Sequence, residues 1–248
     1  MSESAAIVIV GAASDPRVRA LVGVAERSGR TYAVHSADAA DGRAALEGAG
    51  QDGSILPVVV VAGGSVLLDP IGLDLIEELG FPRAQAHTVG ELAVVGAGVT
   101  GLAAAVAAAD RVPRVVVVDP TLPGGSLDPN DRITDYLGFP DGLSGRDLVR
   151  LGVEQARRAG VRFLLAERVE EMLDRGDHLL LVLTSGATVA CRAVVVATGV
   201  DRRPAVELSL PGVVVAATGS ADGAAVAVGA GVAAARRALD YLAGEVAG

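Results

Sequence analysis

The chain has 248 residues, of which 51% are hydrophobic and 2% aromatic, and its formal net charge is −9. This length accommodates one large domain or two modest ones, and the negative charge without any basic run argues against a nucleic-acid-binding surface. The apolar runs are shorter than the ~20 residues of a membrane span, and the first segment lacks the basic residues of a secretory signal. We therefore predict a cytoplasmic protein that does not insert into a membrane. The single cysteine excludes an internal disulfide.

The first part of the chain, residues 1–82, alternates between strand and helix patterns. The predicted elements are strands at 7–10 and 31–35, helices at 15–28 and 41–48, a hairpin of 58–62 with 66–68, and a helix at 73–79. Asp15-Pro16 begins the first helix, because proline is well tolerated in a first turn. This order of elements is that of a thioredoxin or glutaredoxin fold, so we predict a small thioredoxin-like α/β domain.

A mixed polar stretch, residues 83–91, is predicted to be a linker to a second domain over residues 92–248. The predicted elements of this domain are strands at 92–95, 114–118, 161–165, 193–197 and 213–217, helices ending at 109, 159 and 242, and a β-meander at 167–190. Strands that alternate with helices indicate a parallel sheet. We therefore predict a three-layer, Rossmann-like α/β domain.

The segment LAVVGAGVTG places Gly96, Gly98 and Gly101 between a buried strand and a helix. In dinucleotide-binding loops the first glycine allows a tight turn, the second lets the backbone approach a pyrophosphate, and the third lets helix and strand pack closely. The next strand ends in Asp119, where a carboxylate accepts hydrogen bonds from the adenosine ribose. This context favours a dinucleotide site over a glycine turn without a ligand.

Five motifs follow one another along the second domain: GAGVTG, VVVVDP, PGGS, ITDYLGFPDGLSG and RAVVVATG. In this order they resemble the thioredoxin reductase-like FAD-dependent pyridine nucleotide-disulfide oxidoreductases. The resemblance implies that FAD is the cofactor. It implies that Gly124, Gly125 and Ser126 lie against the flavin side, and that Thr198 and Gly199 close over the pyrophosphate.

The chain departs from that family after the ATG motif. Family members carry a nicotinamide-binding domain with its own glycine loop and a CxxC pair before the closing PGV segment. Here only eleven residues separate Gly199 from Pro211, and a domain needs at least ~50 residues. The family's closing GD pair, whose aspartate holds the ribityl chain, is also altered, with Ser220 or Asp222 as its substitute.

Asp135 stands where relatives have asparagine, and by resemblance this position is close to the isoalloxazine. A carboxylate there disfavours an anionic reduced flavin through like-charge repulsion, or serves as a general base. The alternative is a solvated loop aspartate without either role.

The resemblance extends upstream, because LPVVVVAGGSVLLDPIGLDLIEELGF is similar to a thioredoxin-like domain that some family members carry ahead of the flavin domain. Pro57 then corresponds to the cis-proline of that fold. The stretch GAASDPRVRA has no cysteine at the position of the reactive thiolate, which excludes a disulfide reductase role. We expect this domain to serve in docking or dimerisation, and the lone Cys191 to be structural.

These features together favour an atypical FAD-binding oxidoreductase of specialised metabolism. With no nicotinamide domain, electrons come from a small-molecule substrate, as in an oxidase or dehydrogenase. Two alternatives stay open: an enzyme of cyclisation, elimination or isomerisation without net redox chemistry, and a non-catalytic partner subunit. Because the lost domain uncovers apolar surface, we also expect a homodimer.

Overall fold

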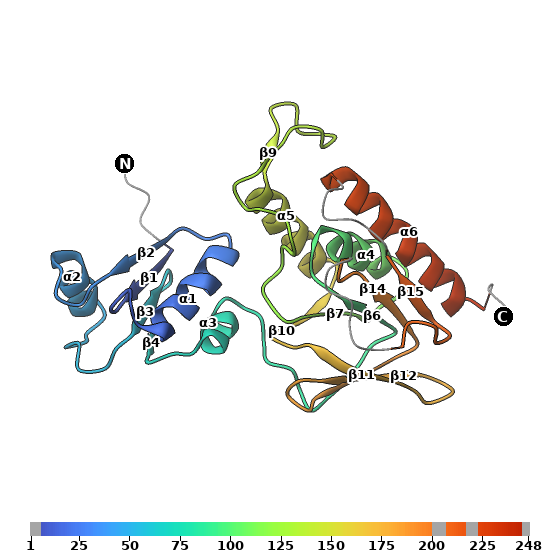
Figure 1. The fold of residues 1–248 in the computed structure, drawn as a ribbon, viewed down its shortest axis with the longest axis horizontal. Coiled ribbons are helices and arrows are strands. Elements are labelled where there is room, and N and C mark those ends of the chain that lie inside the picture. Colours follow the sequence, from blue (N-terminus) through green and yellow to red (C-terminus); the bar gives the residue numbers. More distant parts are fainter. Residues whose placement is uncertain (1–5, 200–206, 217–222, 245–248) are drawn as a thin grey trace. The chain divides into compact units, whose positions relative to one another are not determined.

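The computed structural model describes residues 6–199, 207–216 and 223–244, and the chain divides into two compact units, Met1–Phe81 and Pro82–Gly248 (Figure 1). The elements of the first unit are β1 (Ile7–Val10), α1 (Pro16–Arg27), β2 (Tyr32–His35), α2 (Ala40–Gly48), β3 (Val58–Val61), β4 (Ser65–Leu68) and α3 (Gly72–Glu78). The sheet order is β2-β1-β3-β4. Strand β1 is parallel to β2 and antiparallel to β3, and β4 is antiparallel to β3.

Local sequence explains most of the first unit. Asp15 is the N-cap of α1, where its carboxylate accepts a hydrogen bond of 2.8 Å from the Arg17 backbone N–H, and Pro16 occupies the first turn. The valine-rich strands β1 and β3 are central in the sheet and bury nearly all of their side chains. The Leu56–Pro57 peptide bond is cis, as the family resemblance implies.

The second unit has two sheets and a small hairpin. Its elements are β5 (His87–Val89), β6 (Leu92–Val95), α4 (Val99–Ala109), β7 (Val115–Asp119), β8 (Arg132–Ile133), β9 (Leu143–Ser144), α5 (Gly145–Arg158), β10 (Arg162–Leu165), β11 (Val169–Asp174), β12 (Leu179–Leu183), β13 (Thr188–Cys191), β14 (Ala193–Val196), β15 (Val213–Val215) and α6 (Ala224–Leu242). The main sheet is parallel throughout, in the order β10-β7-β6-β14-β15.

The main sheet is covered on both faces, which gives the predicted three layers. Helices α4 and α6 pack side by side, with α5 against α4 (Figure 1). Side chains of the sheet such as Ala93 and Val116 join one buried cluster with residues of the meander, such as Leu181 and Val189. Strands buried on both faces are apolar at every position, which explains runs such as LAVV and VVVV. No helix among the described residues is long and apolar enough to cross a membrane.

Two short pairings differ from the sequence prediction. Residues 83–91, predicted to be a linker, contain β5, which pairs in parallel with β13 at the edge of the meander sheet. The long loop after β7 contains the hairpin of β8 and β9. These strands have only two or three residues, so they show no hydrophobic period of their own. The partner of β5 also lies about a hundred residues away in the sequence.

Candidate dinucleotide-binding site

The glycine motif lies at the point where the chain reverses its direction of travel across the main sheet. Strands β7 and then β10 lie on one side of β6, and the later strands β14 and β15 lie on its other side. In open parallel sheets, ligands bind at such a switch point, beyond the carboxyl ends of the strands. The loop of residues 96–98, between β6 and α4, occupies this position.

Two glycines of this loop have a steric reason to be glycine. Gly96 has φ of +110°, and a Cβ built on it would lie 2.5 Å from the carbonyl oxygen of Ala197. A Cβ on Gly101 would lie only 1.8 Å from the carbonyl oxygen of Gly96. Real Cβ atoms do not approach backbone so closely. The turn at residue 96 and the close approach of α4 to β6 therefore both require the absence of a side chain.

Gly98 meets a second glycine loop. It is the N-cap of α4, and no side chain caps the helix there. The Gly124 N–H donates to the Ala97 carbonyl oxygen at 3.0 Å, and Gly98 and Gly124 form an isolated parallel bridge. A Cβ on Gly125 would lie 2.9 Å from the Gly98 Cα. The two loops thus face each other with backbone alone, beside the N-terminal amides of α4 and their partial positive charge.

Asp119, at the end of β7, is buried at the edge of the same loop. Its Oδ2 accepts a hydrogen bond of 2.7 Å from the Ala97 N–H. Its Oδ1 accepts from the Thr121 backbone N–H at 2.7 Å and from the Thr121 hydroxyl at 2.9 Å. The carboxylate is therefore fixed next to the glycine loop. Thr121 was not among the predicted site residues, although a hydroxyl two residues after a strand-end aspartate is a usable signal for this turn.

The ATG segment lies on the other side of the loop. The Thr198 backbone nitrogen is 3.1 Å from the position of a Cβ on Gly96, and Gly199 follows with φ of +79°. Ser126, after Gly125, is exposed. The structure therefore brings the predicted glycines, Asp119 and Thr198 together at the carboxyl edge of the sheet. Asp222, like Ser220, lies outside the described residues.

Asp135 lies on the loop between β8 and β9, and its side chain is exposed. Its Oδ2 is 3.4 Å from the position of a Cβ on Gly223, the N-cap of α6. The neighbouring rings of Tyr136 and Phe139 are 6.1 Å apart and pack on a small buried cluster that includes Ala224 at the start of α6. Asp135 is therefore held beside the first turn of α6.

The first unit has no thiol at its predicted redox position. There the carboxylate of Asp15 caps α1, and the Arg17 guanidinium binds it at 2.7 Å and binds Asp69 at 2.5 Å. The hydrogen bond from Arg17 lowers the pKa of Asp15. A carboxylate with its own counter-ion thus occupies the start of α1, the position at which the sequence predicts the reactive thiolate of a thioredoxin-like domain.

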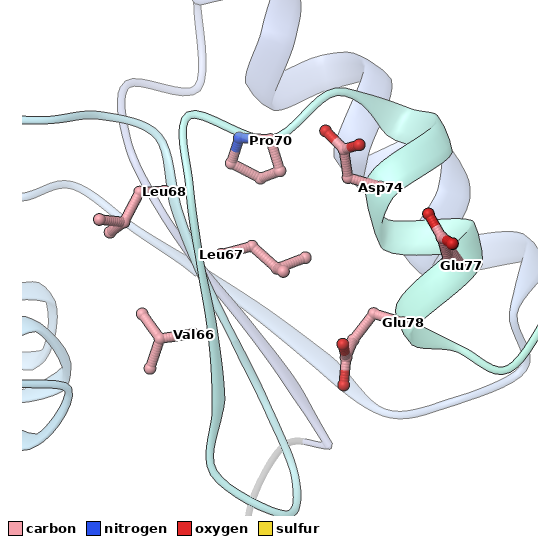
Figure 2. Close-up of a pocket in the computed structure, with 7 residues that line it drawn as sticks. All are labelled: Val66, Leu67, Leu68, Pro70, Asp74, Glu77 and Glu78. Atoms are coloured by element: carbon pink, nitrogen blue, oxygen red, sulfur yellow. The ribbon is translucent and has the colours of Figure 1, made fainter.

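A shallow cavity of about 400 Å³ lies between β4 and α3 of the first unit (Figure 2). Leu67 points toward the helix and its carboxylates, whereas Val66 and Leu68 point to the other side of the strand. The lining has no nucleophile and no cation, so it does not suit an anionic dinucleotide. Among the described residues, no group of three or more histidine, cysteine or carboxylate side chains is placed to hold a metal ion.

Cys191 is at the end of β13 and is 1% exposed. Burial raises the pKa of its thiol to about 12. At pH 8 only about one molecule in ten thousand then carries the reactive thiolate. This supports the structural role that the sequence predicts.

We therefore expect Cys191 to resist an aromatic disulfide reagent at pH 8 in the folded chain, and to react with one equivalent after unfolding in urea. The measurement is the absorbance of the released thiolate over time. A Cys191→Ala variant gives the background. Complete reaction of the folded protein within minutes would contradict a buried, protonated thiol.

Residues 90–240 match the sequence profile of a family described as pyridine nucleotide-disulphide oxidoreductase. A ferredoxin–NADP reductase of Salinispora tropica is 41% identical over 113 residues, which are 44% of this chain and 35% of that protein. A bifunctional thioredoxin reductase/thioredoxin of Mycobacterium leprae is 35% identical over 126 residues, which are 51% of this chain and 27% of that protein. The chain thus spans 35% and 27% of the length of these two curated relatives. The thioredoxin reductase of Streptococcus pyogenes aligns over 50% of this chain and 39% of its own, with 25% identity and a TM-score of 0.42.

Proposed function

The chain belongs to the pyridine nucleotide-disulphide oxidoreductase family, a family of FAD-dependent oxidoreductases, and we propose that its second unit binds FAD and oxidises a small-molecule substrate. One observation carries the proposal. The uncapped start of α4 faces a second glycine loop, and a Cβ at Gly125 would collide with that start. Backbone amides without side chains are what a pyrophosphate requires.

The residues of the site fit the parts of FAD. The first turn of α4 would bind the pyrophosphate, and the loop of Gly124 and Gly125, which faces that turn, would lie on its flavin side. Asp119 would accept hydrogen bonds from the adenosine ribose hydroxyls, and its negative charge would repel the 2′-phosphate of an NADP-type nucleotide. Thr198 and Gly199, beyond β14, would cover the side of the pyrophosphate opposite to Asp119. When bound, FAD would supply a two-electron acceptor at this edge of the sheet.

The source of the electrons follows from the spacing of the sequence motifs. The eleven residues between Gly199 and Pro211 cannot form the nicotinamide domain that the family places there. The single cysteine, Cys191, cannot form a dithiol relay. We therefore assign the role of electron donor to the substrate itself, and the role of final acceptor to oxygen or to a partner protein.

The test is the absorbance spectrum of the full chain as purified and again after addition of excess FAD and desalting. We expect the two visible bands of oxidised flavin to remain with the protein. Anaerobic addition of candidate substrates without nicotinamide then bleaches those bands when a substrate is oxidised. A colourless protein that fails to retain FAD would overturn the proposal. Retained FAD that no oxidisable substrate bleaches would favour the alternative of an enzyme without net redox chemistry.

A further inference from the structure

We propose that the carboxylate of Asp135 makes FAD bound in this site harder to reduce, because it places a negative charge at the flavin half of the cofactor. The inference rests on the proposed binding of FAD.

The two ends of the site follow from the topology. Asp119 at the end of β7 marks the adenosine end, and the start of α4 beyond β6 marks the pyrophosphate. A dinucleotide spans the switch point, so its other half extends from β6 across β14 and β15. These two strands are the ones that α6 contacts. The flavin half would therefore approach the first turn of α6.

Packing places Asp135 at this end. Val99, the first residue of α4, and Ala224, the first of α6, pack on one cluster with Tyr136 and Phe139. The beginnings of both helices are thus neighbours of the loop that carries Asp135. The carboxylate itself lies against Gly223.

The charge at this position is a balance of two effects. The first turn of α6 has no acidic residue and no side-chain cap, so its partial positive charge by itself favours an anion. Asp135 places a full negative charge beside that turn. Within the part of the chain that the structure describes, no cation pairs with this carboxylate. The anionic form of reduced flavin, which gains two electrons and one proton, is then opposed by a like charge.

The experiment measures the midpoint potential of the FAD-loaded full chain, titrated with dithionite beside a reference dye, for wild type and for Asp135→Asn. We expect the variant to shift the equilibrium toward reduced flavin by about three- to tenfold, a rise of ~15–30 mV for a two-electron couple. Because Asp135 is exposed, the difference should shrink when salt is raised from about 0.05 M to about 1 M.

The matched control is Asp110→Asn. Asp110 is the C-cap of α4, so it lies at the end of the helix away from the glycine loop, and the substitution removes the same charge. We expect its potential to equal that of wild type. Equal potentials for Asp135→Asn and wild type would overturn the role of Asp135 while FAD binding stands. Loss of FAD by the wild-type protein would overturn the proposed function, and this inference with it.

Discussion

A Gly98→Asp substitution is expected to abolish FAD binding without destabilising the protein. Gly98 is an N-cap with φ of −69° and ψ of 178° and no side-chain cap, a position where aspartate is favoured over glycine by a few tenths of a kcal/mol. A Cβ there lies 3.5 Å from the Gly125 Cα, which is ordinary contact. The new carboxylate accepts from the amides that would bind the pyrophosphate and repels that anion, and like charges in contact cost several kcal/mol. We expect FAD affinity to fall by a factor of at least about one hundred.

The measurements are FAD retention after desalting and the midpoint of thermal unfolding. The matched control is Ala39→Asp, which introduces the same residue at the uncapped N-cap of α2 in the first unit. It should stabilise its helix by about 1 kcal/mol and leave FAD binding unchanged. Wild-type FAD affinity in Gly98→Asp would show that the start of α4 is not the pyrophosphate site.

The sequence predicts those features whose cause is local. Both faces of the main sheet are covered, so every position from 115 to 118 is apolar. This apolar run predicts a buried parallel strand that ends at Asp119. The spacing of Gly96 and Gly101 predicts a tight turn and a close approach of helix and strand, and both are present in the structure. Gly98, where the spacing predicts an approach of the backbone to a pyrophosphate, is the N-cap of α4. The cis bond before Pro57 was predicted only through the family resemblance, because no local pattern in LPVV distinguishes cis from trans.

The remaining features arise from contacts between distant segments. Strand β5 forms because its backbone pairs with Thr188–Ala190 of β13. The sequence of His87–Val89 alone does not predict a strand. The pairing of Gly98 with Gly124 joins two loops that each look like an independent turn in the sequence. The position of Asp135 beside Gly223 depends on the packing of Tyr136 and Phe139. The family resemblance implied that Asp135 lies close to the flavin, but only the structure shows that it lies beside the start of α6.

A Gly101→Ala substitution tests the close approach of α4 to β6, and the expected result is a large loss of stability. Helix propensity alone predicts the opposite, because alanine is favoured over glycine in a helix by up to ~1 kcal/mol. The added Cβ, however, would lie 1.8 Å from the Gly96 carbonyl oxygen, and the obstacle is backbone, which cannot rotate away. Overpacking of this kind costs roughly 1–3 kcal/mol and occasionally more. We therefore expect the free energy of unfolding to fall by roughly 3 kcal/mol, measured by urea unfolding of the full chain followed by circular dichroism.

The decisive comparison is the same substitution at Gly229 in the interior of α6. A Cβ there meets nothing within 4 Å, so propensity acts alone and Gly229→Ala should stabilise the chain by up to ~1 kcal/mol. Two identical glycine-to-alanine changes in helices of one unit should thus have opposite signs, because only Gly101 lies against the carbonyl oxygen of a turn. If both variants gained stability, α4 would not approach β6 as closely as the structure shows. The glycine loop would then lose the geometry on which the proposed FAD site depends.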